Sequence, residues 1–208
     1  MRRSVALALV ALVLLPGGVL AYQLAQVADS KGCPSHLVPS AGPLKLRVYT
    51  ENAVQAASLD LRAFSAYLSD RVGRPVVIAG IEQTDETGFR LAAAQRPLGD
   101  ELLLFFAYVP SFPNVPTAHG MVDALGFATP GTACAYISFL PTQGATLCRV
   151  GPSLQPLQPS YAYAVHEVGH LMGVSHTPRG IMGTGVFDLC SGDAFTAAQK
   201  SQLAAWGR

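Results

Sequence analysis

One run of residues constrains this chain more than any other part of it: His166-Glu167-Val168-Gly169-His170-Leu171-Met172-Gly173-Val174-Ser175-His176. The run holds three of the five histidines and follows the pattern H-E-x-x-H-x-x-G-x-x-H. Residues four apart on a helix project from the same face, one turn apart. The run therefore predicts a helix that carries His166 and His170 side by side and ends at Gly173.

The spacing gives each of these residues a role at a single zinc ion. His166 and His170 would each supply one nitrogen at about 2.0–2.1 Å. Glu167 is offset by one residue and would lie beside the ion, within reach of a zinc-bound water. Gly173 can adopt a positive φ and turn the chain out of the helix, which would bring His176 back as the third ligand. Three protein ligands leave the fourth position for water, which is the catalytic arrangement.

Other assignments of these residues are open. A downstream Glu, the third ligand in one class of H-E-x-x-H enzymes, is excluded because no Glu follows Glu167. Asp188 and Asp193 remain as alternatives to His176. The three histidines could also be hydrogen-bonded core or surface residues that bind no metal. The remaining two histidines have no such neighbours, and we predict that neither is a ligand: His36 and His119.

The run resembles the signature of the metzincin zinc peptidases, in which such a motif is followed by a turn that contains a methionine. Gly180-Ile181-Met182-Gly183 matches that turn. The resemblance implies that Met182 forms an apolar floor beneath the zinc site. Within the clan, Thr177 is closest to the Ser that follows the third histidine in the matrixin group, and Leu125–Gly131 resembles the matrixin approach to its edge strand. The clear resemblance covers residues 160–183.

The chain also departs from the matrixin pattern. No Asp/His cluster matches the structural zinc and calcium sites of matrixins, so we expect one catalytic Zn²⁺ ion and neither of those ions. Cys33, followed by Pro34, could in principle sit on the zinc as a latency thiolate, as a matrixin prodomain Cys does. The residues around Cys33 do not match that motif, and a disulfide is the favoured alternative.

The N-terminus has the features of a targeting segment. Arg2 and Arg3 precede the uncharged apolar run Ser4–Leu15, and Ala21 ends a plausible cleavage site. We expect residues 1–21 to be a cleaved signal peptide or, alternatively, an uncleaved membrane anchor through residues 4–21. Residues 22–43 would then be a linker, and residues 44–208 a secreted or otherwise extracytoplasmic catalytic domain.

The cysteine content agrees with export. The chain has four cysteines, all beyond residue 21, and an even number in an exported protein predicts two disulfides. Three pairings are open. We favour Cys134–Cys148, which closes a short loop, together with Cys33–Cys190.

The composition excludes two other classes of chain. Hydrophobic residues make up 50% and charged residues 13%, which is the opposite of the balance in disordered chains. Lys and Arg number 14 against 13 Asp and Glu, so no basic surplus exists for binding nucleic acid. We expect a monomer whose partner is a protein or peptide substrate.

Apolar patterns predict an α/β (α+β) fold, and the resemblance implies that it is one small metzincin-like catalytic domain. The predicted strands are Leu44–Thr50, Val76–Ala79, Leu102–Val109 and Ala133–Leu140. The predicted helices are a long one over Ala53–Val72, an active-site helix from Ser160 to Gly173 and a C-terminal helix after the Met-turn, from Thr196 to Trp206. Residues 110–131 and 141–159 are predicted loops. This order favours a mixed twisted sheet with helices packed against it.

Together these features predict a zinc endopeptidase in which Glu167 is the general base. The substrate would lie extended along an edge strand near Ala133–Phe139, paired through its backbone. Two alternatives remain: a non-catalytic exported module that keeps zinc for stability, and a zinc hydrolase of a non-peptide amide. Glu167 argues against the first alternative, because binding zinc does not require it.

Overall fold

The computed structural model describes residues 33, 41–96, 100–117, 120–128, 132–178, 180–183, 190 and 195–206. The predicted signal peptide or anchor, residues 1–21, and most of the predicted linker, residues 22–43, lie outside the described residues. Within the described ranges, no helix combines the length and the apolar character that crossing a bilayer requires.

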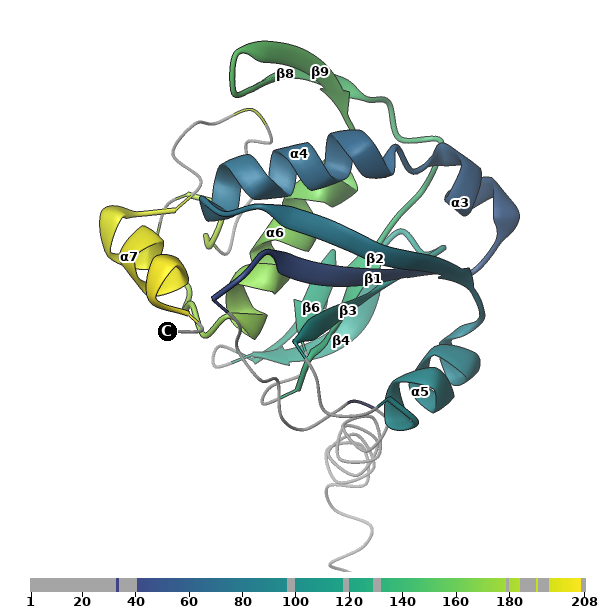
Figure 1. The fold of residues 1–208 in the computed structure, drawn as a ribbon. Helices are drawn as coiled ribbons and strands as arrows, with labels where there is room; N and C mark the ends of the chain where they lie inside the picture. Colours follow the sequence, from purple (N-terminus) through teal and green to yellow (C-terminus); the bar gives the residue numbers. More distant parts are fainter. Residues whose placement is uncertain are drawn as a thin grey trace, which may run out of the picture.

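A five-stranded sheet in the order β2-β1-β3-β7-β6 forms the centre of the fold (Figure 1). Its strands are β1 (Leu44–Thr50), β2 (Val76–Gln83), β3 (Glu101–Ala107), β6 (Gly126–Ala128) and β7 (Cys134–Ser138). The strands β2, β1, β3 and β7 run parallel, whereas β6 is antiparallel to β7. The mixed α/β fold is therefore confirmed. The prediction that Ala133–Phe139 contains an edge strand is wrong, because β7 is interior and β6 forms the edge.

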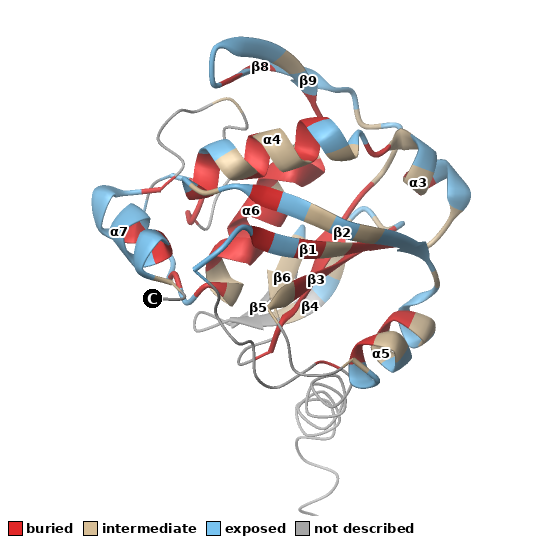
Figure 2. Ribbon diagram, in the orientation of Figure 1, coloured by how far each residue is buried: buried red, intermediate tan, exposed pale blue. Residues whose placement is uncertain are grey.

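Helices cover both faces of the sheet (Figure 1). On one face lie α4 (Leu61–Val72) and α6 (Pro159–Leu171), and on the other lies α5 (Glu86–Ala94). Side chains of β3 alternate between the two faces: Leu104 packs on the α4 and α6 side, and Phe105 packs on the α5 side. Because both faces are covered, β3 is buried along nearly its whole length (Figure 2).

The same alternation explains why the predicted disulfide pairing is wrong. Two disulfides are present, but they join Cys33 to Cys134 and Cys148 to Cys190, with Cα–Cα distances of 5.9 and 4.8 Å. Cys134 packs on the α5 side of the sheet, whereas Cys148 packs on the opposite side. The two are close in sequence, but the sheet lies between them. Because the thiol of Cys33 is bonded to Cys134, it does not serve as a latency ligand in this structure.

The predicted long helix over Ala53–Val72 is two helices. The first, α3 (Ala53–Ser58), ends at Leu59, whose backbone is extended, and α4 begins after Asp60. The carboxylate of Asp60 accepts a hydrogen bond from the N–H of Ala63 at 2.9 Å, which is an N-cap. A cap of this kind starts a new helix without interrupting the apolar spacing, so the sequence pattern alone reads as one helix.

Two predicted loops contain antiparallel strands. Residues 110–131 include β6 and a hairpin of β4 (Phe112–Thr117) and β5 (Gly120–Ala124). Residues 141–159 include a hairpin of β8 (Thr146–Val150) and β9 (Ser153–Leu157). Prolines occur in β4 and β9 and favoured a loop prediction. In the part of the chain that the structure describes, β4 and β9 each have one neighbouring strand, so they tolerate a residue without an N–H.

The remaining elements follow or extend the predictions. β1 has the predicted bounds, and α7 (Ala197–Ala205) begins at the predicted cap, Thr196. β2 is longer than predicted. The short helix α5 was not predicted, and it begins where the carboxylate of Asp85 accepts from the N–H of Gly88 at 2.7 Å.

Candidate active site

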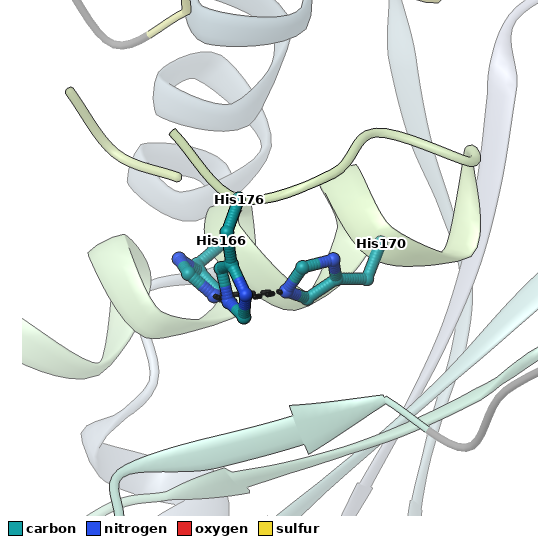
Figure 3. Close-up of side chains that lie close together, drawn as sticks. All are labelled: His166, His170 and His176. Carbon is teal, nitrogen blue, oxygen red and sulfur yellow. Dashed lines mark hydrogen bonds between the residues drawn. The ribbon is translucent and has the colours of Figure 1, made fainter. Parts of the chain in front are cut away.

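The active-site helix α6 ends at the predicted glycine. Gly173 has a φ of 83°, which is left-handed. The N–H groups of Gly173 and Val174 donate to the carbonyl oxygens of His170 and Gly169, each at 2.9 Å, and close the helix as a Schellman motif. The turn reverses the chain and brings His176 back toward the histidines of α6 (Figure 3).

The three histidines predicted as ligands converge on one point (Figure 3). The Nε2 atom of His170 lies 3.0 Å from that of His166 and 3.0 Å from that of His176, and the third separation is 3.1 Å. The Nδ1 atom of His166 lies 2.5 Å from the carbonyl oxygen of Ile181, and that of His170 lies 2.9 Å from the carbonyl oxygen of Val174. Since a carbonyl only accepts, both Nδ1 atoms carry the proton, and both Nε2 atoms keep a lone pair.

This arrangement fits a bound cation. The Nε2 lone pairs of His166 and His170 face each other, and neither atom can donate a hydrogen bond to the other. Ligands of a tetrahedral zinc ion at about 2.0–2.1 Å lie roughly 3.3 Å apart, close to the observed spacing. Among the described residues, these three histidines form the only group of three or more His, Cys, Asp or Glu that could hold a metal ion.

Burial keeps the two histidines of α6 uncharged. The pKa of His166 is lowered to about 4, mainly by burial and also by His170 and His176, against the opposing effect of its bond to Ile181. Burial also lowers the pKa of His170. At neutral pH both imidazoles are therefore in the neutral form, which is the form that coordinates a metal.

Glu167 lies beside the three histidines and not among them. Its Oε1 atom is 4.0 Å from Nε2 of His166, and the residue is only 5% exposed. Burial raises the pKa of Glu167 to about 8, while a backbone hydrogen bond with Ala128 opposes the shift. A carboxyl group in this position can take up and release a proton next to the histidine cluster.

The edge strand β6 approaches this carboxyl group closely. A Cβ atom at Gly126 would lie 3.0 Å from both Cγ and Oε1 of Glu167, and 3.1 Å from the carbonyl oxygen of Tyr136. Real Cβ atoms rarely make contacts this short, so the approach depends on a residue without a side chain.

Met182 packs against α6 from the turn that follows His176. It is fully buried, and a Cβ atom at Gly169 would lie 2.7 Å from its Sδ atom. The turn is closed by the N–H of Gly183, which donates to the carbonyl oxygen of Gly180 at 3.0 Å. Gly169, between the two histidines of α6, is therefore what lets the methionine reach the helix. That Met182 forms the floor of a zinc site stays a prediction.

Several predicted or excluded site residues lie outside the described residues: Asp188, Asp193, His36 and His119. Three residues near the site were not identified from the sequence: Gly126, Gln199 and Gln202. A sequence signal exists for Gln199 alone, because it stands three residues after Thr196 in the pattern of a capping box.

The raised pKa of Glu167 predicts that the stabilities of metal-free wild type and metal-free Glu167→Gln differ by an amount that depends on pH. The pKa of Glu167 is about 8 in the fold and ordinarily 4.5, so between these two pH values wild type must take up a proton to fold. The contribution of Glu167 to stability is therefore fully present below pH 4.5 and falls as pH rises towards 8, by at most about 1.4 kcal/mol per pH unit. Glu167→Gln is neutral throughout, so its stability relative to wild type should increase over this range.

Chemical unfolding in the presence of a chelator, at several pH values across that range, measures this difference. A difference in unfolding free energy that stays constant would mean that Glu167 ionises in the fold as it does in an unfolded chain.

Comparisons with known proteins find only distant structural similarity. No protein-family model and no curated protein matches the chain. An archaemetzincin from Methanopyrus kandleri has a TM-score of 0.49 at 16% identity, over 80% of this chain and 97% of that one. A zinc-dependent peptidase from Methanocorpusculum labreanum (strain Z) has a TM-score of 0.41 at 20% identity, over 76% of this chain and 99% of that one. At these values, what those proteins do does not transfer to this chain.

Proposed function

We propose that this chain is a zinc-dependent endopeptidase that acts outside the cytoplasm. One observation carries the proposal: three imidazole Nε2 atoms converge at 3.0–3.1 Å with a buried carboxyl group 4.0 Å from one of them. His166, His170 and His176 would hold one Zn²⁺ ion, and Glu167 would be the catalytic base. We place the chain in the metzincin clan, nearest the matrixin-like group, on the residues of its motif and turn.

The proposed mechanism divides the chemistry between the metal and Glu167. Bound zinc would polarise the scissile carbonyl and lower the pKa of a water molecule, so that the water can lose a proton as it attacks the carbonyl. The carboxylate of Glu167 would accept a proton from the attacking water and then deliver it to the leaving amide nitrogen. Burial raises the pKa of Glu167 in the metal-free protein, whereas the positive charge of a bound ion nearby would favour the carboxylate form that accepts the proton. The three imidazoles would remain neutral throughout.

We further propose that the substrate peptide pairs with the outer edge of β6, which has no neighbouring strand among the described residues. The N–H of Ser138, in β7, donates to the carbonyl oxygen of Leu125, just before β6, so these two residues are a hydrogen-bonded pair between the two strands. In an antiparallel ladder the bonded and non-bonded pairs alternate, so the backbone groups of Gly126 and Ala128 face away from β7. The hydrogen bond between the backbone of Ala128 and the carboxyl group of Glu167 agrees with this orientation. A peptide added at this edge would run past the carboxyl group.

The substitution Gly126→Ala should therefore lower kcat for peptide hydrolysis by about 10–100-fold, because the added Cβ displaces the carboxyl group of Glu167. The zinc content should not change, since the atoms nearest to the added Cβ belong to Glu167 and Tyr136 and not to a histidine. Gly144→Ala is the matched control, because a Cβ there would meet nothing within 4 Å. If Gly126→Ala hydrolyses peptide at the wild-type rate, β6 does not position Glu167.

The two disulfides support a location outside the cytoplasm, where such bonds form and persist. Residues 1–21 would direct the chain there, either as a cleaved signal peptide or as a membrane anchor. Mass determination of the protein isolated from its cells distinguishes the two, because cleavage after Ala21 would remove the first 21 residues.

Zymography tests the proposed activity. The purified protein should clear casein or gelatin, a zinc chelator should abolish the clearing, and added zinc should restore it. If zinc-loaded protein cleaves small amides but no peptide, it is a hydrolase of non-peptide amides. If zinc-loaded protein cleaves neither, it is a binding module.

A further inference from the structure

In the segment between His170 and His176, side chains donate hydrogen bonds to three consecutive backbone carbonyl groups. Each carbonyl oxygen accepts a hydrogen bond from a different side chain: Gly173 from Gln202 Nε2 at 2.5 Å, Val174 from His170 Nδ1 at 2.9 Å, and Ser175 from Gln199 Nε2 at 3.1 Å. One of these donors belongs to the histidine cluster. The other two belong to α7, which lies far along the chain from α6.

This helix is also held by contacts with the core at both of its ends. Leu203 of α7 is fully buried, and Phe195, just before the helix, is 3% exposed in the same apolar cluster. At the other end, Nη1 of Arg74 donates to the carbonyl oxygen of Trp206 at 3.1 Å, and the guanidinium lies 5.4 Å from the centre of the Trp206 ring. The two glutamines therefore project from a helix whose position does not depend on their own hydrogen bonds alone.

The amide of Gln199 is oriented by the cap of its own helix. Its Oε1 atom accepts from the N–H of Thr196 at 2.9 Å, which completes a capping box. With Oε1 committed to a donor, Nε2 faces the carbonyl oxygen of Ser175. The residue is only 6% exposed, so the amide has little freedom to turn away.

The third histidine needs such support more than the other two. His166 and His170 are held by the backbone of α6, whereas residues 174–177 belong to no helix or strand. His176 directly follows Ser175, so a bond that fixes the Ser175 carbonyl also limits where the imidazole can lie. On its other side, the N–H of Thr177 donates to the carbonyl oxygen of Met182 at 3.0 Å.

We propose that Gln199 and Gln202 are positioning residues, which fix the backbone that carries His176 and thereby set the affinity and the coordination geometry of the zinc site. This inference rests on the proposed zinc site. It makes α7, which contributes no ligand, part of what holds the metal.

Two substitutions remove the donors with little other change. Gln202→Met is close in shape to glutamine and lacks the N–H₂ group, and residue 202 is exposed, so the variant should fold. Gln199→Glu keeps an oxygen for the capping box and, when ionised, has no donor for Ser175, so it is measured at a pH at which the carboxyl group is ionised. Controls on the same helix are Ser201→Ala, which is exposed, and Thr196→Ala, which weakens the cap and leaves the Nε2 atom of Gln199 in place.

Zinc affinity by competition with a chelator, and the visible spectrum of the Co²⁺-substituted protein, are the two readouts. Each glutamine variant should bind zinc about tenfold more weakly and the double variant about 100-fold more weakly, with an altered Co²⁺ spectrum. Gln202→Lys, which keeps a donor, should bind zinc with about wild-type affinity. Thr196→Ala should lower the melting temperature without altering the Co²⁺ spectrum.

The outcomes separate this inference from the proposed function. A wild-type protein that binds no zinc would overturn the proposed function, and the inference with it. A wild-type protein that binds zinc, together with glutamine variants that match its affinity and its Co²⁺ spectrum, would overturn the inference alone. Weak binding by Gln202→Met that Gln202→Lys does not rescue would also overturn it.

Discussion

Glu167→Ala should lose nearly all peptide hydrolysis and keep its zinc. The carboxyl group is 4.0 Å from Nε2 of His166 and bonds to the backbone of Ala128, so it lies next to the proposed metal site without joining the three imidazoles. Its removal leaves those imidazoles and their backbone partners in place. What is lost is the group that accepts and returns the proton, a role worth typically about 10²–10⁴-fold in rate.

The measurement compares kcat and zinc content in wild type, Glu167→Ala and a surface control. Glu86→Ala is a suitable control, because Glu86 pairs with Arg90 on α5, on the other face of the sheet from α6. Hydrolysis by Glu167→Ala at close to the wild-type rate would contradict the mechanism.

His176→Ala should lose the metal altogether. The variant keeps the two histidines of α6, but two protein ligands do not make the three-histidine set of a catalytic zinc site. Wild type should be stabilised by zinc, by about 4 kcal/mol when free zinc is roughly 1,000 times the dissociation constant. The variant should show no such zinc-dependent gain in unfolding free energy.

Elemental analysis after dialysis, together with unfolding with and without zinc, measures both effects. His119→Ala is the matched control, since we predict that His119 is not a ligand, and it should retain zinc. Full zinc content in His176→Ala would mean that another group, such as Asp188 or Asp193, is the third ligand.

The histidine cluster could be predicted because its geometry is local. The helical spacing of His166 and His170 fixes two rings on one face, and the glycine at 173 permits the turn that returns His176. These relations involve residues within one segment of chain. The same holds for α7, whose cap at Thr196 is visible in the sequence.

The features that the sequence did not predict depend on contacts between distant segments. The position of β6 outside β7 follows from strand pairing, which apolar patterns within one strand do not specify. The disulfide pairing depends on which face of the sheet each cysteine occupies. The bond from Gln202 to Gly173 joins two segments that pack together only in the folded protein.

The most direct test of the central claim is a zinc titration of metal-free protein with a mixture of peptides, in which cleavage products are followed by mass spectrometry. The three-histidine site predicts that cleavage of internal peptide bonds rises with added zinc and stops rising at about one zinc per chain. Cleavage that persists without metal would contradict the account, and so would the absence of any cleavage once zinc is fully bound.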